Sequence, residues 1–136
     1  MTTEPRRSPV QTDQAPAAIG PYSQAIAAGG FLFVSGQIAL DPSSGEMVGD
    51  GDITAETRQV LANLGAVLAA GGCGFGDVVK ATIYLSDMAD FATVNGLYGD
   101  AVGTETPPAR AAFAVAQLPK NARVEIEAVA LLPDRS

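Results

Sequence analysis

The segment PARAAFAVAQLPKNARVEIEAVAL, residues 108–131, contains two apolar runs. A charged residue lies at or near the start of each run. Arg110 directly precedes the first run, and the second run begins with Val124 and Glu125. Runs of this length, rich in Ala, Val, Phe and Ile, are typical of β-strands. A guanidinium or a carboxylate beside such strands is costly to bury unless it is paired or binds something charged. The stretch therefore suggests a small anionic ligand.

The spacing of these two charges limits how they can cooperate. If residues 110–117 paired with residues 123–131 as a hairpin, Arg110 would face Ala130, about five positions from Glu125. At about 3.4 Å per residue this is about 17 Å along the ladder, too far for one small ligand. Either the two strands are not paired in this register, or Arg110 of one copy meets Glu125 of another copy at a subunit interface.

Composition narrows the classes of protein that the chain can belong to. Its 136 residues suit one domain, and no apolar stretch approaches the roughly 20 residues that span a bilayer. The formal net charge of −7 and the lack of a basic cluster argue against nucleic acid as a partner. The chain has no histidine, the commonest metal ligand, and Cys73 is its one cysteine, so neither a metal nor an internal disulfide is expected. These features favour a cytoplasmic protein without membrane partners.

The chain reads as an α+β protein whose sheet is mixed or antiparallel. The expected order is ββαβαββ, with strands at 21–26, 31–40, 78–85, 110–117 and 123–131 and helices beginning after Thr54 and Asp90. Gly29 and Gly30 suit the tight turn of a hairpin between the first two strands. Residues 1–13 are expected to be a flexible segment before a single domain of residues 14–136.

Both expected helices carry apolar side chains on one side, at the spacing of an amphipathic helix. In the first helix these are Val60, Leu61, Leu64, Val67 and Leu68, and in the second they are Phe91, Val94, Leu97 and Tyr98. Gly71 and Gly72 end the first helix. The glycine-rich residues 71–76 do not form a phosphate cradle, because they follow a helix and lack the GxGxxG spacing.

Several short motifs occur in one order along residues 14–131. They are APAAIGPYSQA (15–25), VSGQI (34–38), NL (63–64), DVVK (77–80), DFATVN (90–95), PAR (108–110), LPK (118–120) and VEIE (124–127). Each motif alone is weak, but the set at compatible spacing is specific. Together they resemble the RidA/YjgF family of imine deaminases.

This resemblance implies a chorismate-mutase-like fold and a homotrimer with ligand clefts between its subunits. The implied reaction is hydrolysis of short-chain 2-imino acids, such as 2-iminobutanoate and 2-iminopropanoate, or of their enamine tautomers. The products are 2-keto acids and ammonia, and no cofactor or metal is required. Because these imines arise from PLP-dependent dehydratases and damage other PLP enzymes, the implied role is protective.

The resemblance also assigns roles to individual residues. Arg110 matches the arginine that binds the substrate carboxylate, and Glu125 matches the glutamate that orders the attacking water. Both are therefore the expected catalytic residues. The other positions expected to bind substrate are Tyr22, Ser35, Gly36, Asn95 and Ala112, and Ala112 stands where many relatives carry a cysteine.

Each assignment has a purely structural alternative. Arg110 can be the ion-pair partner of a strand end, while Glu125 and Glu127 can be the solvent-facing positions of a strand. We interpret Glu127 as structural. Tyr22, Ser35 and Asn95 can equally pack a turn or cap local backbone. A different function is a non-catalytic trimer that binds 2-keto acids or acts as a chaperone-like protein, whereas a ribonuclease fits the acidic charge poorly.

Overall fold

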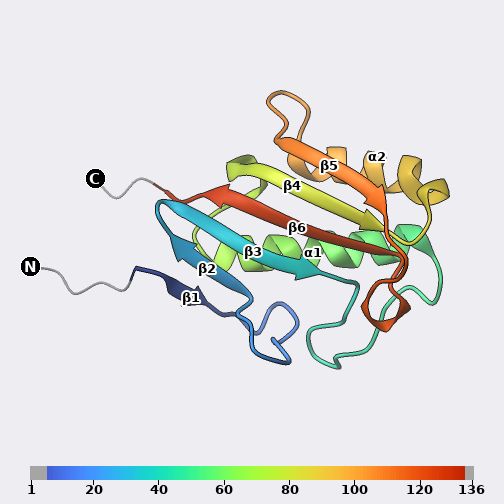
Figure 1. The fold of residues 1–136 in the computed structure, drawn as a ribbon, viewed down its shortest axis with the longest axis horizontal. Helices are drawn as coiled ribbons and strands as arrows, with labels where there is room; N and C mark the ends of the chain where they lie inside the picture. Colours follow the sequence, from blue (N-terminus) through green and yellow to red (C-terminus); the bar gives the residue numbers. More distant parts are fainter. Residues whose placement is uncertain (1–5, 134–136) are drawn as a thin grey trace, which may run out of the picture.

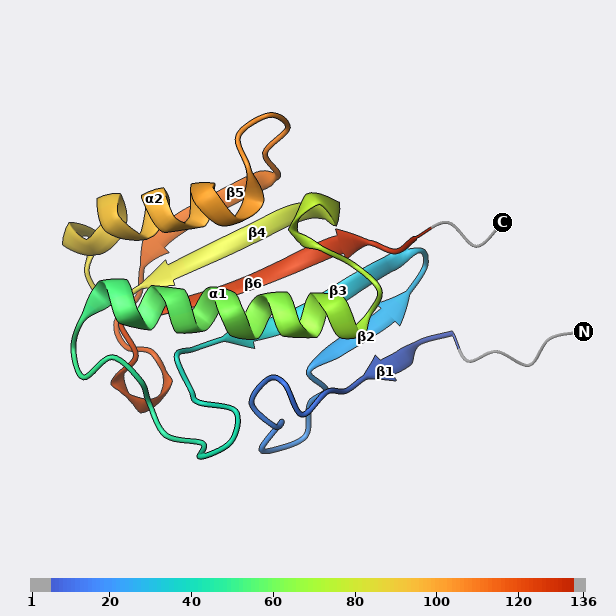
Figure 2. The same cartoon turned by 180° about the vertical axis from the view of Figure 1, so that it is seen from behind.

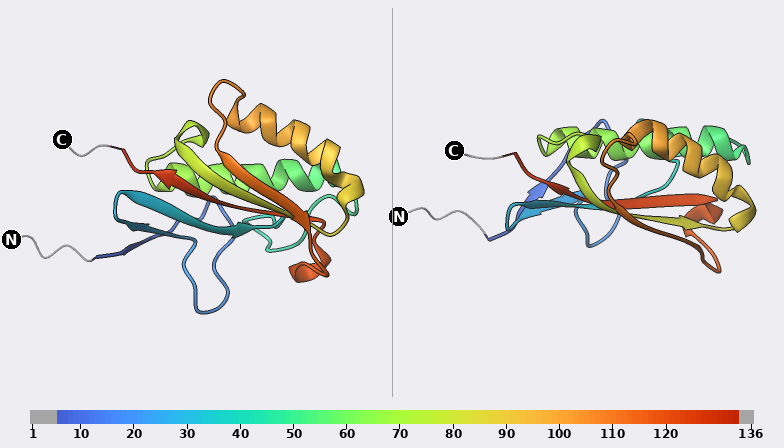
Figure 3. Two further views of the ribbon diagram at one scale, coloured as in Figure 1. Left: turned by 45° about the horizontal axis from the view of Figure 1, so that its top comes forward. Right: turned by 90° about the horizontal axis from the view of Figure 1, so that it is seen from above.

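The computed structural model describes residues 6–133, which fold into a mixed β-sheet with α-helices on one side (Figure 1). The described residues contain six strands and two α-helices. They are β1 (Ser8–Val10), β2 (Ala25–Ala28), β3 (Phe31–Gln37), α1 (Ile53–Ala70), β4 (Val78–Leu85), α2 (Phe91–Val102), β5 (Ala109–Ala114) and β6 (Val124–Leu131). Figure 2 shows α1 and α2 in front of the sheet, and the right panel of Figure 3 shows the two layers edge-on. The expected α+β class is confirmed.

The strands lie in the order β1-β2-β3-β6-β4-β5. β4 and β5 are parallel and are connected through α2, whereas the other neighbouring strands are antiparallel. Since β4 lies between β5 and β6, the two C-terminal strands do not form a hairpin. The sequence leaves open whether residues 110–117 and 123–131 pair with each other. The structure shows that they do not.

Two strands are shorter than expected: β3 ends at Gln37 and not at residue 40, and β5 ends at Ala114 and not at residue 117. The N-terminal part of the sheet differs from the expectation in two further ways. β1 pairs with β2, so residues 8–10 of the segment expected to be flexible belong to the sheet, while residues 1–5 lie outside the described residues. Pro9 fits there because β1 is an edge strand, where a missing N–H costs no ladder bond. β2 begins at Ala25 and not at residue 21, because Tyr22 N–H turns back to the carbonyl of Gly20 (2.9 Å).

The expected helices are present, with differences at both caps. Asp90 precedes α2 as expected, but its side chain accepts no capping hydrogen bond. α1 is capped by Asp52 and not by Thr54: the Asp52 carboxylate accepts the Thr54 N–H at 3.0 Å. The predicted apolar stripe of α1 is buried against the sheet. At its end, a Cβ built on Gly71 would lie 2.5 Å from Cδ2 of Leu32, so a glycine lets the helix approach β3 closely. In α2, Val94 and Tyr98 are buried as predicted.

The two faces of the sheet have different surroundings. α1 and α2 cover the face that carries Leu32, Ile83 and Ile126, each fully buried. We call the opposite side the open face, and Figure 1 looks onto it. Large side chains of the open face remain substantially exposed, namely Phe31, Phe33, Phe113 and Leu131. Neither helix of residues 6–133 has the length and apolarity that a bilayer crossing requires.

Candidate active site

The first group of expected site residues gathers where β3 ends and β6 begins. The β3–β6 pairing is irregular between Val34 and Gln37, at Ser35 and Gly36. Such bulges commonly redirect side chains at functional sites. A Cβ built on Gly36 would overlap Oε2 of Glu125 and lie 2.9 Å from its Cδ. The carboxyl group of Glu125 therefore occupies space that only a glycine at position 36 leaves free.

Glu125 lines an open cavity of about 630 Å³, which we call the Glu125 pocket. Its polar and aromatic lining consists of Tyr22, Gln24, Ser35, Gln37, Lys120 and Glu125. The Ser35 hydroxyl donates to the carbonyl of Ser23 at 2.6 Å, so it holds the backbone next to Tyr22. The Tyr22 side chain is 54% exposed, which places it at the rim and not in the packed core.

Buried amide side chains hold two edges of this pocket. Gln24 accepts the Thr12 N–H at 2.7 Å and donates to the Pro16 carbonyl at 2.8 Å. Asn63, on α1, donates to the carbonyl of Ile38 at 3.0 Å. Both amides are almost fully buried, so these hydrogen bonds are shielded from water. The pocket edges are thus built into the fold.

Glu125 has an environment suited to accepting a proton. Burial raises the pKa of its carboxyl group above the usual value of 4.5, and the neighbouring charge of Glu127 raises this pKa further. A carboxylate whose pKa is nearer to neutrality is a stronger base.

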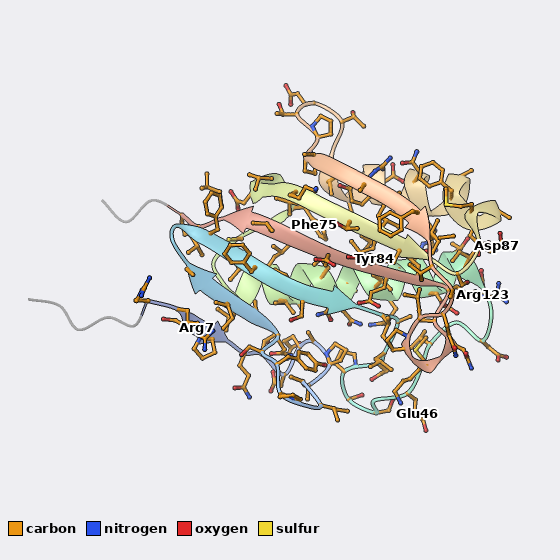
Figure 4. The ribbon with its side chains drawn as sticks, viewed as in Figure 1. Arg7, Glu46, Phe75, Tyr84, Asp87 and Arg123 are labelled. Carbon is orange, nitrogen blue, oxygen red and sulfur yellow. The ribbon has the colours of Figure 1, made fainter. Side chains whose placement is uncertain are left out.

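Glu127 has a partner of its own on the open face. The Tyr84 hydroxyl, on β4, donates to Oε1 of Glu127, and this hydrogen bond raises the pKa of Tyr84. The Tyr84 ring in turn meets the edge of Phe113, on β5, with centroids 5.4 Å apart. Figure 4 shows Tyr84 over the β4–β6 part of the sheet. Glu127 thus belongs to a hydrogen-bonded cluster beside Glu125, so it affects the electrostatics of the site.

The second group of expected site residues lies between β5 and α2. Nη1 of Arg110 donates to Oδ1 of Asn95 at 2.6 Å. The Arg110 guanidinium carbon lies 5.6 Å from the ring centroid of Phe91 and 5.2 Å from that of Tyr98. These partners, which the structure gives Arg110 within residues 6–133, are all neutral. The strand-end ion pair considered as an alternative is not among them.

Arg110 also borders an open cavity of about 610 Å³, which we call the Arg110 pocket. Asn95 and Tyr98 contribute to its wall, together with the glycine- and proline-containing loop between α2 and β5. The Arg110 side chain is exposed, whereas Tyr98 is 4% exposed. Asp100 also lines this pocket, but the groups that contact the guanidinium directly are neutral, so an anionic ligand displaces no ion-pair partner there.

The two pockets lie on opposite faces of the sheet. Arg110 pairs with Ala81 of β4, whose buried side chain faces the helices. Glu125 pairs with Tyr84, three positions further along β4 and therefore on the open face. The two residues are thus about 10 Å apart along the strands and two strand spacings apart, about 10 Å, across them. Arg110 and Glu125 of one chain do not share a small ligand.

Ala112 is the last of the expected site residues, and three further residues lie close to the two pockets. Ala112 pairs with Ile83, packs against the core and lines neither of these two pockets. Lys120 lines the Glu125 pocket, although its LPK motif was not assigned a role. The sequence gives Phe91 and Tyr98 no functional signal, because their spacing is that of any amphipathic helix. Residues 6–133 contain no group of three or more metal-ligating side chains.

Comparisons with known proteins show the family to which the chain belongs. The model of the family described as Endoribonuclease L-PSP matches residues 12–132. A RutC family protein of Synechocystis is 56% identical over 124 residues, which are 91% of this chain and 95% of the relative. Human 2-iminobutanoate/2-iminopropanoate deaminase is 50% identical over 125 residues, which are 92% of this chain and 90% of the relative.

Solved structures show the same fold. The crystal structure of the Rid family protein YyfA from Yersinia pestis superposes with a TM-score of 0.89 and 44% identity, covering 93% of this chain and 99% of that one. The family model covers most of the chain, and the sequence and structural relatives agree with it. The chain therefore belongs to the Endoribonuclease L-PSP family, which is the RidA/YjgF family that its motifs resemble.

Proposed function

We propose that this protein hydrolyses short-chain 2-imino acids and their enamine tautomers to 2-keto acids and ammonia. The environment of Arg110 is the observation that supports the proposal most directly. Its guanidinium borders an open pocket and contacts an amide oxygen and two aromatic rings. Such a guanidinium can bind a carboxylate through two parallel hydrogen bonds. The name of the human relative supports an imino acid as the bearer of that carboxylate.

In the proposed reaction Glu125 orients a water molecule towards the imine carbon. As the C–O bond forms, Glu125 accepts a proton from this water and delivers it to the nitrogen. Glu125 then takes the proton of the new hydroxyl group and passes it to the nitrogen, so that the C=O bond forms as the C–N bond breaks. One imino acid and one water thus give one 2-keto acid and one ammonia. The raised pKa of Glu125 suits this relay. The Gly36 N–H, Tyr22, Ser35, Asn95 and backbone at Ala112 are the further groups that we assign to substrate binding.

We place this reaction at sites shared between two copies of a homotrimer. Support comes from the opposite orientations of Arg110 and Glu125, which leave each chain with two half-sites. Further support comes from the apolar side chains exposed on the open face, because exposed apolar surface of this kind is typical of subunit interfaces. The proposed location is the cytoplasm, where the free thiol of Cys73 would stay reduced.

Turnover tests the proposal. Threonine dehydratase generates 2-iminobutanoate in situ, and the rate of 2-ketobutanoate formation is compared with and without this protein. We expect acceleration that is abolished in Arg110→Ala and reduced about 10²- to 10⁴-fold in Glu125→Gln. Arg58→Ala, which removes an exposed arginine of α1, is the matched control and retains activity.

The same assay separates the alternative function. A non-catalytic trimer that binds 2-keto acids, or a chaperone-like protein, would keep Arg110 and make no use of Glu125. Such a protein would bind 2-ketobutanoate while leaving the decay of the imine unchanged. That result would reject the hydrolase.

A further inference from the structure

The contacts of Arg110 point to residues that prepare it for its ligand. On α2, Asn95 follows Phe91 by four residues and Tyr98 follows it by seven. This spacing places the three side chains on one face of the helix. All three contact the Arg110 guanidinium: Asn95 by a hydrogen bond of 2.6 Å and the rings at 5.6 and 5.2 Å. We call these three side chains the α2 cradle.

An arginine on an edge strand needs such support. β5 pairs only with β4 among the strands of residues 6–133, and the Arg110 side chain is exposed. A long exposed side chain samples several rotamers, and a ligand that requires one of them must immobilise it. Contacts that restrict the guanidinium before the ligand arrives reduce this entropy cost and so increase affinity.

The cradle restrains the guanidinium without neutralising it. An aromatic ring attracts a cation through its quadrupole, and no opposite charge has to be displaced when an anion binds. Asn95 accepts a hydrogen bond from one of the five guanidinium N–H groups. The other donors remain available for a bidentate carboxylate. A carboxylate in the place of Asn95 would hold the arginine equally well but would compete with the substrate.

Tyr98 separates the role of the ring from that of the hydroxyl. Its side chain is 4% exposed, and its hydroxyl is buried without a hydrogen-bond partner among residues 6–133. Leaving a hydroxyl unpaired is unfavourable, so it does not explain the placement of Tyr98. The ring, in contrast, both packs in the core and contacts Arg110.

We propose that Phe91 and Tyr98 are positioning residues, whose rings hold the Arg110 guanidinium in the orientation that binds the substrate carboxylate. This inference rests on the proposed function, because it takes the carboxylate as the ligand of Arg110. Neither ring needs to touch the substrate.

The first test measures binding and turnover in the assembled protein. Phe91→Leu and Tyr98→Leu are expected to raise the Kd for 2-ketobutanoate and the KM for the imine about 3- to 30-fold, while kcat stays near that of the wild type. Tyr98→Phe is expected to restore the affinity that Tyr98→Leu loses. Val94→Ala, a truncation of a fully buried residue of α2, is the control: it lowers the Tm without changing the Kd.

Two results would overturn the proposal. One is an unchanged Kd in both leucine variants, which would mean that the rings serve only the core. The other is equal weakening in Tyr98→Phe and Tyr98→Leu, which would assign the effect to the hydroxyl.

A second measurement does not depend on the ligand and so distinguishes this inference from the proposed function. The Nε–Hε resonance of Arg110, assigned by its loss in Arg110→Lys, reports the mobility of the side chain through its heteronuclear NOE. The cradle predicts a rigid side chain in the wild type and Tyr98→Phe and a mobile one in Tyr98→Leu. If the wild type neither binds 2-ketobutanoate nor hydrolyses the imine, the proposed function fails. A mobile Arg110 side chain in the wild type would reject the positioning role itself.

Discussion

Arg110 and Glu125 project from opposite faces of the same sheet, with β4 between their strands. Arg110 lies over the helix side, beside α2, and Glu125 lies over Gly36 on the open face. Each of them lines a separate pocket. One chain therefore has the two functions of the proposed reaction, carboxylate binding and water activation, in places that cannot serve a single substrate molecule.

Gly36→Ala tests the placement of the Glu125 carboxyl group. The added Cβ would overlap Oε2, so the end of the Glu125 side chain must move, while the backbone N–H at position 36 is kept. We expect activity to fall about 10²-fold, near the loss in Glu125→Gln, with little change in Tm.

Gly76→Ala is the matched control for this substitution, because a Cβ at position 76 meets nothing within 4 Å. Wild-type activity in Gly36→Ala would show that the position of Glu125 does not matter for the reaction.

Glu127→Gln tests the electrostatic influence of the open-face cluster. The substitution removes a negative charge that helps to raise the pKa of Glu125, but it keeps a side-chain oxygen that can accept the Tyr84 hydroxyl. The pKa of Glu125 then falls, so the acid limb of the pH profile of kcat/KM moves to lower pH. Glu46→Gln, in an exposed loop, should leave the profile in place. A shift to higher pH would reject the assignment of Glu125 as the base.

We expect the Glu125→Gln variant to be more stable than the wild type, by an amount that depends on pH. The folded protein binds the Glu125 proton more tightly than the unfolded chain does, because the folded pKa is raised above 4.5. The stability of the wild type therefore falls as the pH rises through the interval between 4.5 and the folded pKa.

The glutamine side chain of the variant does not titrate, so the stability of the variant does not fall in this interval. The variant should therefore be more stable than the wild type at pH 7, and the difference in the free energy of unfolding should shrink as the pH falls below 4.5. Urea unfolding at a fixed protein concentration measures both free energies. A variant less stable than the wild type at pH 7 would contradict the direction of the pKa shift.

Phe33→Glu tests the association of the open face. The Phe33 side chain is 46% exposed on that face, and a buried charge there would oppose assembly. Light scattering should give about 41 kDa for the wild type, three copies of the 13.8 kDa chain, and the mass of one chain for the variant. Ala62→Glu, on an exposed position of α1, should leave the mass unchanged. A wild type with the mass of one chain would exclude the homotrimer.

The sequence predicts most of the fold because its patterns are local. The apolar stripe of α1 and the residues of β4 follow from helical spacing and from strand composition, and both are confirmed. The sequence does not predict β1, because three residues around Pro9 show no alternation and become a strand only by pairing with β2. Thr54 is a plausible cap in the sequence, but Asp52 is an equally good cap residue, and only the structure shows that Asp52 accepts the hydrogen bond.

The candidate site shows where sequence patterns stop being informative. The motifs predict Arg110 and Glu125 as catalytic residues, but no motif states that β4 separates their strands. Phe91 and Tyr98 have the spacing of core residues, and they are indeed packed against the core. Their contact with Arg110 arises only because α2 lies beside β5 in the folded chain. Such contacts depend on tertiary structure.

Mixing two variants that each lack one half of the proposed site tests the shared site most directly. Arg110→Ala and Glu125→Gln are unfolded, combined in equal amounts and refolded together, so that a site between two chains can take Arg110 from one chain and Glu125 from the other. With random assembly, about one quarter of such sites are intact, and we expect about one quarter of the wild-type activity for 2-iminobutanoate. Activity no higher than that of the separate variants, in trimers shown by mass spectrometry to be mixed, would contradict the shared site.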